Sequence, residues 1–307
     1  MKIVLLDALT FGESDLSGFD ALGSVEVYQT TSVQETQARV ADADVIVTNK
    51  VVITDANMQN SPNLKLICVA ATGMNNIDLE AAKRREILVK NVAGYSTTSV
   101  IQHTFSMLFY LIGHSRYYDE VVKSGEYSRG KIFTDVSQPF FEISGKKWGI
   151  IGLGEIGRGV ANIAKSFGSE VCYYSTSGRN RTEDFQRTTL EDMLKTCDII
   201  SIHAPLNEQT NNLLDYEQLL TCKDGAVVLN LGRGGIINEE AVAKIIDEKN
   251  ISFGLDVLQK EPMRQNHPLL HVKNKESLYV TPHIAWTSIE ARRTLIASIV
   301  ENISSLK

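Results

Sequence analysis

The stretch that decides the fold is KWGIIGLGEIGRGVANIAKSFG at residues 147–168. Its glycines are spaced as G-x-G-x-x-G. The first glycine of such a motif allows a tight turn, the second lets the backbone approach a pyrophosphate, and the third lets a helix pack close to the strand. The helix that follows would face the phosphates with its free N–H groups. We therefore expect a dinucleotide to contact Gly152, Gly154, Glu155, Ile156 and Gly157.

The second half of the chain continues the alternation that this stretch begins. Short apolar runs alternate with segments of helical spacing, as in parallel strands joined by crossover helices. Six strands are expected, the strand number of a dinucleotide-binding sheet. We place the strands at 147–151, 170–174, 199–203, 227–230, 254–257 and 278–281, and the helices at 157–167, 190–195, 216–220 and 239–248.

The first hundred residues show a similar pattern. Their apolar runs are nearly continuous, as in strands that are buried on both faces of a parallel sheet. One long helix is expected at 99–124, a polar linker at 126–145, and a last helix at 288–304 that returns to the first domain. The strands of the first block are expected at 3–7, 25–28, 45–48, 66–70 and 88–91, with helices at 33–41 and 79–85.

These patterns predict an α/β protein with two doubly wound parallel-sheet domains. The first is flavodoxin-like and comprises residues 1–98 plus 285–307. The second is a Rossmann dinucleotide-binding domain at residues 99–284. The length of 307 residues fits two domains at about 150 residues each.

Composition argues against several classes of function. The formal net charge is −6 and no basic stripe is present, which argues against a nucleic-acid partner. No apolar run reaches the roughly 18 residues of a membrane span. The four cysteines form no CxxC pair and no HExxH or Cys/His cluster occurs, so we expect reduced thiols, no metal, and a cytoplasmic location.

The residue after the second strand of the cofactor domain bears on the choice of cofactor. NAD sites place Asp or Glu there to bind the ribose hydroxyls. Here Ser175 and Thr176 take that place, and Arg179 and Arg181 follow. Hydroxyls and a pair of arginines can hold a 2′-phosphate. The stretch therefore modestly favours NADP(H); the alternative is that these arginines simply point to solvent, and NAD(H) remains open.

Several further stretches resemble one family, the D-isomer-specific 2-hydroxyacid dehydrogenases. The resemblance spans essentially the whole chain, and the HIAW ending is most similar to the glycerate dehydrogenase/hydroxypyruvate reductase branch. The matching stretches are IIGLGEIG at 150–157, LNLGRGGIINEEA at 229–241, GLDVLQKEP at 254–262, TPHIAW at 281–286, VAATGMNNID at 69–78 and GYSTTSVIQHTF at 94–105. The family's catalytic order of Arg, Glu and His falls on Arg233, Glu261 and His283.

Chemistry supports the same three residues. Reduction of a 2-oxoacid needs a cation that binds the carboxylate, and the planar fork of Arg233 suits this. It needs an acid for the carbonyl oxygen, and His283 suits this near neutral pH. A carboxylate such as Glu261 should hold the second ring nitrogen. Taken singly, each residue is as well explained by a surface or core role, so the prediction depends on their joint order and their placement after strand ends.

The resemblance assigns further residues to the site. Ala71, Thr72 and Gly73 would receive the substrate carboxylate, and Asn49 could add to that pocket or be an ordinary loop residue. Thr104, His203, Pro205 and Asp256 would contact the cofactor. We find no constellation of chemically reactive residues around His114, His267 or His271.

The resemblance also implies a substrate, a partner and two alternatives. A small polar acid such as hydroxypyruvate or glyoxylate is expected, and a homodimer formed around the 99–124 helix. The first alternative is a nucleotide-sensing protein of the same fold, such as a corepressor. The second is a relative that acts on another acid, such as formate or phosphite.

Overall fold

The computed structural model describes residues 1–179 and 182–306. These residues form two compact units. One comprises Met1–Ser96 together with the chain from Thr287 onward, and the other comprises Thr97–Trp286. The chain thus crosses between units at 96/97 and 286/287, two residues from each crossing expected from the sequence.

The first unit contains a five-stranded parallel sheet in the order β2-β1-β3-β4-β5. Of the three inner strands, β3 and β4 are fully buried, as their unbroken apolar sequences predict. This strand order is that of flavodoxin-like folds, which confirms the predicted class. The strands are β1 (Lys2–Leu5), β2 (Ser24–Val27), β3 (Val45–Thr48), β4 (Leu66–Val69) and β5 (Leu88–Lys90).

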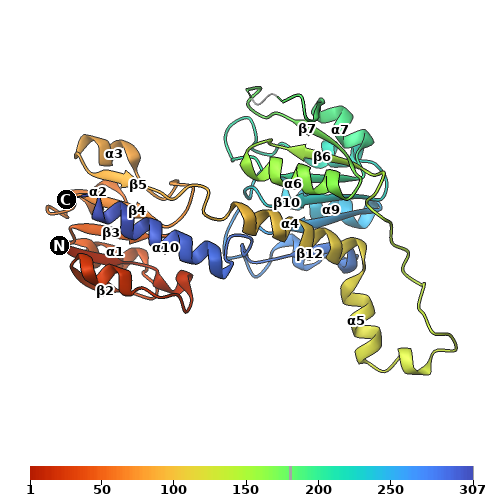
Figure 1. Ribbon diagram of the computed structural model, residues 1–307, viewed down its shortest axis with the longest axis horizontal. Helices are drawn as coiled ribbons and strands as arrows, with labels where there is room; N and C mark the ends of the chain where they lie inside the picture. Colours follow the sequence, from red (N-terminus) through yellow and green to blue (C-terminus); the bar gives the residue numbers. More distant parts are fainter. Residues whose placement is uncertain (180–181, 307) are drawn as a thin grey trace. The chain divides into compact units, whose positions relative to one another are not determined.

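Helices cover the sheet of the first unit. The C-terminal helix α10 (Ile289–Ser304) packs against β4 and against the 3-10 helix η2 (Ser17–Leu22). Figure 1 shows this helix, drawn in blue, beside strands from the first hundred residues, which confirms the predicted return of the chain. The other elements are η1 (Ala8–Phe11), α1 (Val33–Val40), α2 (Asp55–Gln59) and α3 (Leu79–Arg84).

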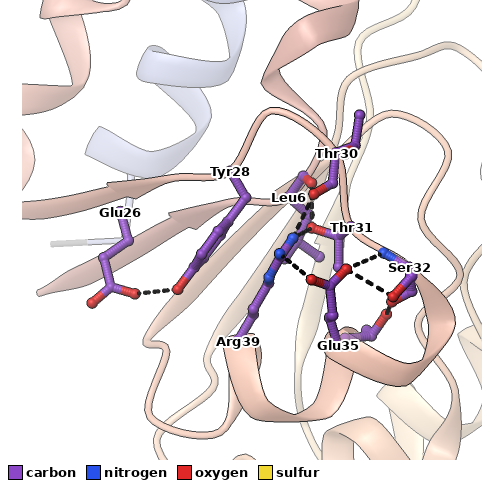
Figure 2. Close-up of polar contacts among 9 residues, drawn as sticks. Leu6, Glu26, Tyr28, Thr30, Thr31, Ser32, Glu35 and Arg39 are labelled. Carbon is purple, nitrogen blue, oxygen red and sulfur yellow. Dashed lines mark hydrogen bonds and ion pairs between the residues drawn. The ribbon is translucent and has the colours of Figure 1, made fainter.

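Figure 2 shows how α1 is fixed to the end of β2. Ser32 and Glu35 form a capping box, in which the Glu35 carboxylate accepts from the Ser32 N–H at 2.9 Å. Arg39, one turn further on, donates to Thr30 O and to Glu35. Its guanidinium also lies 4.1 Å from the centre of the Tyr28 ring. These contacts hold both ends of a short, mostly polar helix.

The second unit contains a seven-stranded parallel sheet in the order β12-β11-β10-β9-β6-β7-β8. This is the Rossmann order with β12 added at one edge. Six of the strands match the six predicted. The strand that was not predicted is β8 (Gln186–Arg187), because two polar residues carry no periodic signal. The others are β6 (Lys147–Ile151), β7 (Glu170–Tyr174), β9 (Ile199–Ile202), β10 (Ala226–Asn230), β11 (Ile251–Leu255) and β12 (Leu278–Val280).

Two buried clusters lie on opposite faces of this sheet. One contains apolar side chains of α4 and α6 with Ile150 and Leu229, and the other contains those of α7, α8 and α9 with Ile151 and Val228. The helices are α4 (Thr97–Ile112), α6 (Glu155–Ser166), α7 (Leu190–Thr196), α8 (Tyr216–Thr221) and α9 (Glu239–Glu248), with the 3-10 turns η4 (Pro268–Leu270) and η5 (Lys275–Ser277).

The single helix expected at 99–124 is two helices, and that prediction was wrong. After α4, His114 adopts φ +46°, and α5 (Ser115–Lys123) begins in a new direction. Because Gly113 and His114 interrupt the backbone, the apolar spacing alone could not reveal the break. No residue of α5 is buried. The segment beyond it contains only the 3-10 turn η3 (Tyr127–Arg129).

Within the described residues, no helix combines the length and the apolar character needed to cross a membrane. The same part of the chain contains no group of three or more His, Cys, Asp or Glu side chains placed to bind a metal ion.

Candidate active site

The glycine turn after β6 has the properties that its motif predicts. A Cβ at Gly152, which has φ +91°, would lie 2.9 Å from Ala204 N, and a Cβ at Gly157 would lie 2.2 Å from Gly152 O. Neither position can hold a larger residue without movement. Gly154, at the start of α6, has nothing within 4 Å of such a Cβ. Glu155 is exposed and Ile156 half-buried. The turn therefore offers an accessible backbone at the N-terminus of a helix, which suits phosphate groups.

Two orphaned polar atoms flank this turn. The register pairs Ile151 of β6 with Tyr174 of β7 and with Ile202 of β9, so Ser175, Gly152 and His203 follow on three adjacent strands. Of the residues that the structure describes, Ser175 Oγ and His203 Nδ1 are the buried side-chain atoms without a hydrogen-bond partner. Such atoms are rare in folded proteins and indicate a missing polar partner.

The protonation of His203 follows from its neighbours. Trp148 Nε1 donates to Ser201 Oγ at 2.9 Å, and Ser201 Oγ lies 3.1 Å from His203 Nε2. Burial lowers the pKa of His203 to about 3, so the ring is neutral. Because the Ser201 hydroxyl can both donate and accept, it can pair with His203 Nε2 in either tautomer of the neutral ring. Within the described residues His203 Nδ1 is left as an unpaired ring nitrogen beside an accessible glycine turn, and these groups fit the ribose hydroxyls and phosphate oxygens of a dinucleotide.

The turn after β7 contains the residues that bear on cofactor choice. Ser175 is buried, Thr176 half-buried, and Arg179 exposed. Sequence reasoning missed Arg187 of β8, whose Nη2 lies 4.0 Å from a Cβ built at Gly178. The only feature that could have indicated Arg187 is its position on β8, a strand too short to leave a pattern in the sequence. Arg181, which was also predicted to bear on cofactor choice, lies outside the described residues.

The Glu261–His283 pair forms as predicted in geometry. His283 Nδ1 lies 2.8 Å from Glu261 Oε2, with side-chain exposures of 22% and 31% respectively. Glu261 Oε1 accepts from Leu258 N at 3.0 Å. Within the described residues, His283 Nε2 has no hydrogen-bond partner. The carboxylate therefore fixes one ring nitrogen and leaves the other available to exchange a proton with a bound molecule.

Asp256 builds the turn that presents His283. Its carboxylate, 1% exposed, accepts from Thr281 Oγ1 at 2.6 Å, Ile284 N at 2.8 Å and Ala285 N at 3.0 Å. Its carbonyl accepts from His283 N at 2.8 Å. These contacts hold His283 at φ +56°, a conformation that non-glycine residues seldom adopt and that occurs at functional sites. Asp256 therefore has a structural task that the sequence did not indicate.

A second histidine lies against the same carboxylate. His103 Nε2 of α4 lies 3.2 Å from Thr281 Oγ1 and 3.6 Å from Asp256 Oδ1. Burial lowers the pKa of His103 although the Asp256 charge acts to raise it. His103 therefore supports the His283 turn as a neutral side chain.

Arg233 lies on a glycine turn beyond β10. Asn230 Nδ2 donates to Arg233 O at 2.9 Å, and Arg233 Nη1 donates to Gly232 O at 2.8 Å. A Cβ at Gly234 would lie 1.9 Å from Leu258 C, so this turn packs directly on the backbone that leads to Glu261. Because β10, β11 and β12 are adjacent and parallel, Arg233, Glu261 and His283 all follow the carboxyl ends of neighbouring strands.

Two expected cofactor residues behave differently from the rest. Thr104 has no exposed surface, and its hydroxyl donates to Val100 O at 2.8 Å within α4. The structure therefore gives Thr104 a role inside its own helix and does not bring it to the surface of the site. Pro205 is exposed, two residues beyond His203.

The residues expected to receive the substrate lie in the first unit. Ala71 and Gly73 are half-buried and Thr72 is exposed, on the loop after β4. Asn49 is only 4% exposed, which favours the role of an ordinary loop residue over that of a pocket residue. Asp7 was not predicted to take part, but its buried carboxylate accepts from the backbone N–H groups of Asn49 and Lys50 at 2.9 and 2.7 Å. Asp7 thus anchors the loop after β3.

A second Glu–His pair lies in the same unit as the first. His267 Nε2 lies 2.8 Å from Glu239 Oε2, and both side chains are buried, with exposures of 5% and 9%. No constellation of reactive residues was expected around His267, and its contact with Glu239 was not predicted. Its partner precedes it by 28 residues, and neither stretch contains a signal that links the two.

Comparison with known proteins identifies the family. The profile described as "D-isomer specific 2-hydroxyacid dehydrogenase, NAD binding domain" matches residues 105–285. The chain is 33% identical over 311 residues to a hydroxypyruvate reductase of Blautia hydrogenotrophica, covering 99% of this chain and 96% of the relative. It is 31% identical over 306 residues to a glycerate dehydrogenase of Methylorubrum extorquens, covering 99% and 95%.

A solved structure agrees with this assignment of the fold. An acyclic imino acid reductase in complex with NADPH and D-Arg superposes with a TM-score of 0.87 at 29% identity, covering 100% of this chain and 97% of that one. The glycine turn, the orphaned polar atoms and the family match together indicate a nicotinamide cofactor. The chain therefore belongs to the D-isomer-specific 2-hydroxyacid dehydrogenases, NAD(P)-linked oxidoreductases that reduce 2-oxoacids to D-2-hydroxyacids.

Proposed function

We propose that this enzyme reduces a small polar 2-oxoacid of the hydroxypyruvate or glyoxylate type. The observation that carries the chemistry is the Glu261–His283 pair, in which one ring nitrogen is fixed and the other is available. The substrate class is supported by the names of the relatives, which include a hydroxypyruvate reductase, a glycerate dehydrogenase and several glyoxylate reductases.

The roles of the three residues follow from their chemistry. The guanidinium of Arg233 binds the substrate carboxylate through two parallel hydrogen bonds. His283 Nε2 gives its proton to the carbonyl oxygen, and Glu261 stabilises the protonated ring and holds its orientation. When bound beside the glycine turn of Gly152, Gly154 and Gly157, a nicotinamide cofactor would supply the hydride for this reduction.

The assay that tests this proposal follows absorbance at 340 nm with hydroxypyruvate and glyoxylate. Pyruvate serves as the comparison substrate because it has the same reacting group and lacks the hydroxyl. We expect kcat/KM to be higher for hydroxypyruvate than for pyruvate. Preference for pyruvate would overturn the substrate class. Tight cofactor binding with no oxidation of the reduced cofactor by hydroxypyruvate, glyoxylate or pyruvate would favour the nucleotide-sensing alternative. Turnover of formate or phosphite would favour a relative that acts on another acid.

We further propose that the cofactor is NADP(H). Ser175 stands where NAD sites place a carboxylate, and Arg179 and Arg187 lie on and beside the turn that follows. Two guanidinium groups near this turn suit a 2′-phosphate. Replacing Arg187 with Gln should lower affinity for NADPH in a fluorescence titration and leave that for NADH near the wild-type value. Equal effects on both cofactors would contradict the proposal, and Ser175→Asp should shift the preference toward NADH.

A homodimer is also proposed, with its contact on α5 and the segment that follows. Because the apolar face of α4 is buried within its own unit, the exposed apolar side chains gather further along. Phe133, Phe140 and Val136 are 89%, 68% and 77% exposed, and such exposed side chains favour a protein partner. Analytical ultracentrifugation should give twice the chain mass, and Phe133→Ser with Phe140→Ser should give one chain mass. A wild-type protein that sediments as one chain would overturn this proposal.

A further inference from the structure

We propose that Glu239, held by His267, is a positioning residue for the Glu261–His283 pair. The inference rests on the proposed function, since it gives Glu239 a task in orienting the proton donor. Glu239 is the first residue of α9 and is buried, whereas its neighbour Glu240 is exposed. A buried carboxylate is unfavourable unless it is paired and hydrogen-bonded. Glu240 occupies the same helix end without burial, so the helix terminus alone does not require Glu239 to be buried.

The hydrogen bonds of Glu239 reach the loop that carries Glu261. Glu239 Oε1 accepts from Gln259 N at 2.5 Å, while Oε2 binds His267. The next peptide back along the chain, at Leu258, donates its N–H to Glu261 Oε1 at 3.0 Å. Glu239 therefore holds one peptide of this loop, and the neighbouring peptide orients the carboxylate that holds His283.

His267 fixes the position of Glu239. His267 Nδ1 accepts from Leu269 N at 3.3 Å, as the cap of η4. Its ring proton therefore lies on Nε2 and points at Glu239. Both nitrogens are engaged, so His267 does not exchange protons with a substrate. His267 therefore acts as a fixed hydrogen-bond donor that restrains the Glu239 carboxylate.

The same backbone also receives the Arg233 turn. A Cβ at Gly234 would lie 2.3 Å from Gln259 N and 2.0 Å from Leu258 O. The peptides of Leu258 and Gln259 thus touch the Arg233 turn on one side, bind Glu239 on another, and orient Glu261 directly. Displacement of these peptides would move all three groups of the proposed catalytic set together. Small displacements of this kind lower rates strongly because reacting groups must be closely aligned.

The test compares Glu239→Gln with Glu240→Gln, a matched change at the adjacent exposed position. In Glu239→Gln the new amide donor faces the donor of His267, so one of the two contacts of residue 239 must be lost. We expect kcat for hydroxypyruvate to fall about 10-fold with KM little changed. The alkaline limb of kcat/KM should move to lower pH by about 0.5 unit, because Glu261 supports the protonated ring less well. Glu240→Gln should match the wild type in each respect.

A purely structural role predicts a different result. Glu239→Gln would then lower the unfolding midpoint and leave both kcat and the pH limb of the folded enzyme at wild-type values, which would overturn the inference. If Glu239→Gln does not fold, His267→Gln and His267→Leu replace it. The first keeps a donor near Nε2 and should behave as the wild type, whereas the second should reproduce the lower kcat and shifted limb. A wild-type limb in His267→Leu would also overturn the inference.

One further variant separates this inference from the proposed function. His283→Gln tests the proton donor itself in the same assay series. Loss of turnover in His283→Gln together with a wild-type pH limb in Glu239→Gln overturns only the positioning role. Wild-type turnover in His283→Gln overturns the proposed catalytic assignment, and the positioning role with it.

Discussion

The second unit contains two Glu–His pairs with the same 2.8 Å contact and different surroundings. In the Glu261–His283 pair the side chains are 31% and 22% exposed, whereas in the Glu239–His267 pair they are 9% and 5% exposed. The first pair is held through Nδ1 and leaves Nε2 available. The second uses Nε2 for its carboxylate and Nδ1 for a backbone N–H.

This difference separates chemistry from support. A histidine acts as an acid only when one nitrogen can meet a substrate. A histidine with both nitrogens bound to its own chain cannot do so, whatever carboxylate lies beside it. The same two side chains at the same distance thus serve two roles, which are decided by burial and by the nitrogen that each pair leaves open.

The largest expected effect is on the exposed pair. His283→Gln should lower kcat by about 10²- to 10⁴-fold, the range of general acid catalysis. Cofactor affinity, measured by quenching of protein fluorescence, should stay at the wild-type value because the ring is proposed to contact only the substrate. Turnover near the wild-type rate would remove the distinction between the two pairs.

The buried pair should contribute more to stability than the exposed pair does. His267→Ala leaves the Glu239 carboxylate buried without its donor, which should lower the free energy of unfolding by about 2–4 kcal/mol in urea titrations. His283→Ala, at a partly exposed position, should change the same quantity by only about 0.5 kcal/mol. Equal losses in the two variants would show that burial does not separate the pairs.

Glu261→Gln should have an intermediate effect, now on the pH profile. The amide cannot stabilise a protonated His283, so kcat/KM for reduction should fall by about 10- to 100-fold, with its alkaline limb at lower pH. Because Glu261 is 31% exposed, the unfolding midpoint should hardly move. The contrary result is a large loss of stability at unchanged kcat/KM, which would place Glu261 with the supporting residues.

His203, a third histidine, has no carboxylate partner, and its replacement should have the smallest effect at neutral pH, because the contribution of His203 changes only as the pH falls. Its pKa is lowered from 6.5 to about 3 by burial. The unfolded chain therefore binds more protons than the folded chain between these pH values. The contribution of neutral His203 to the free energy of unfolding is fully present above pH 6.5 and is lost as the pH falls toward 3. In His203→Asn the free energy of unfolding should vary less with pH across this window, by about 1 kcal/mol per pH unit. Parallel curves for the two proteins would show that His203 is not buried as a neutral ring.

Periodicity predicted most of the fold. The apolar runs located five strands of the first sheet and six of the second, because buried parallel strands are apolar on both faces. It failed at β8, which is two polar residues long, and at the break between α4 and α5. Both failures have the same cause: short or interrupted elements depend on their neighbours and leave little pattern in the sequence.

The candidate site divides along a similar line. The motif GLGEIG and the order of Arg233, Glu261 and His283 could be recognised from the sequence, since each stands next to a strand end or in a glycine turn. Thr104 was also named from the sequence, but its hydroxyl is bound within α4. Asp7, Arg187 and the partner of His267 could not be found, because each acts through a contact between residues distant in the chain.

The sequence by itself determined the two-sheet architecture, the glycine turn and the identity of the family, since all of these depend on residues close together in the chain. Only the tertiary structure decided that Asp256 builds the His283 turn, that His203 Nδ1 has no partner among the described residues, and that Glu239 and His267 meet in the interior. The physical reason is that burial and hydrogen-bond partners are properties of the packed chain. A histidine and a glutamate 22 residues apart and another such pair 28 residues apart differ only once the fold has placed them.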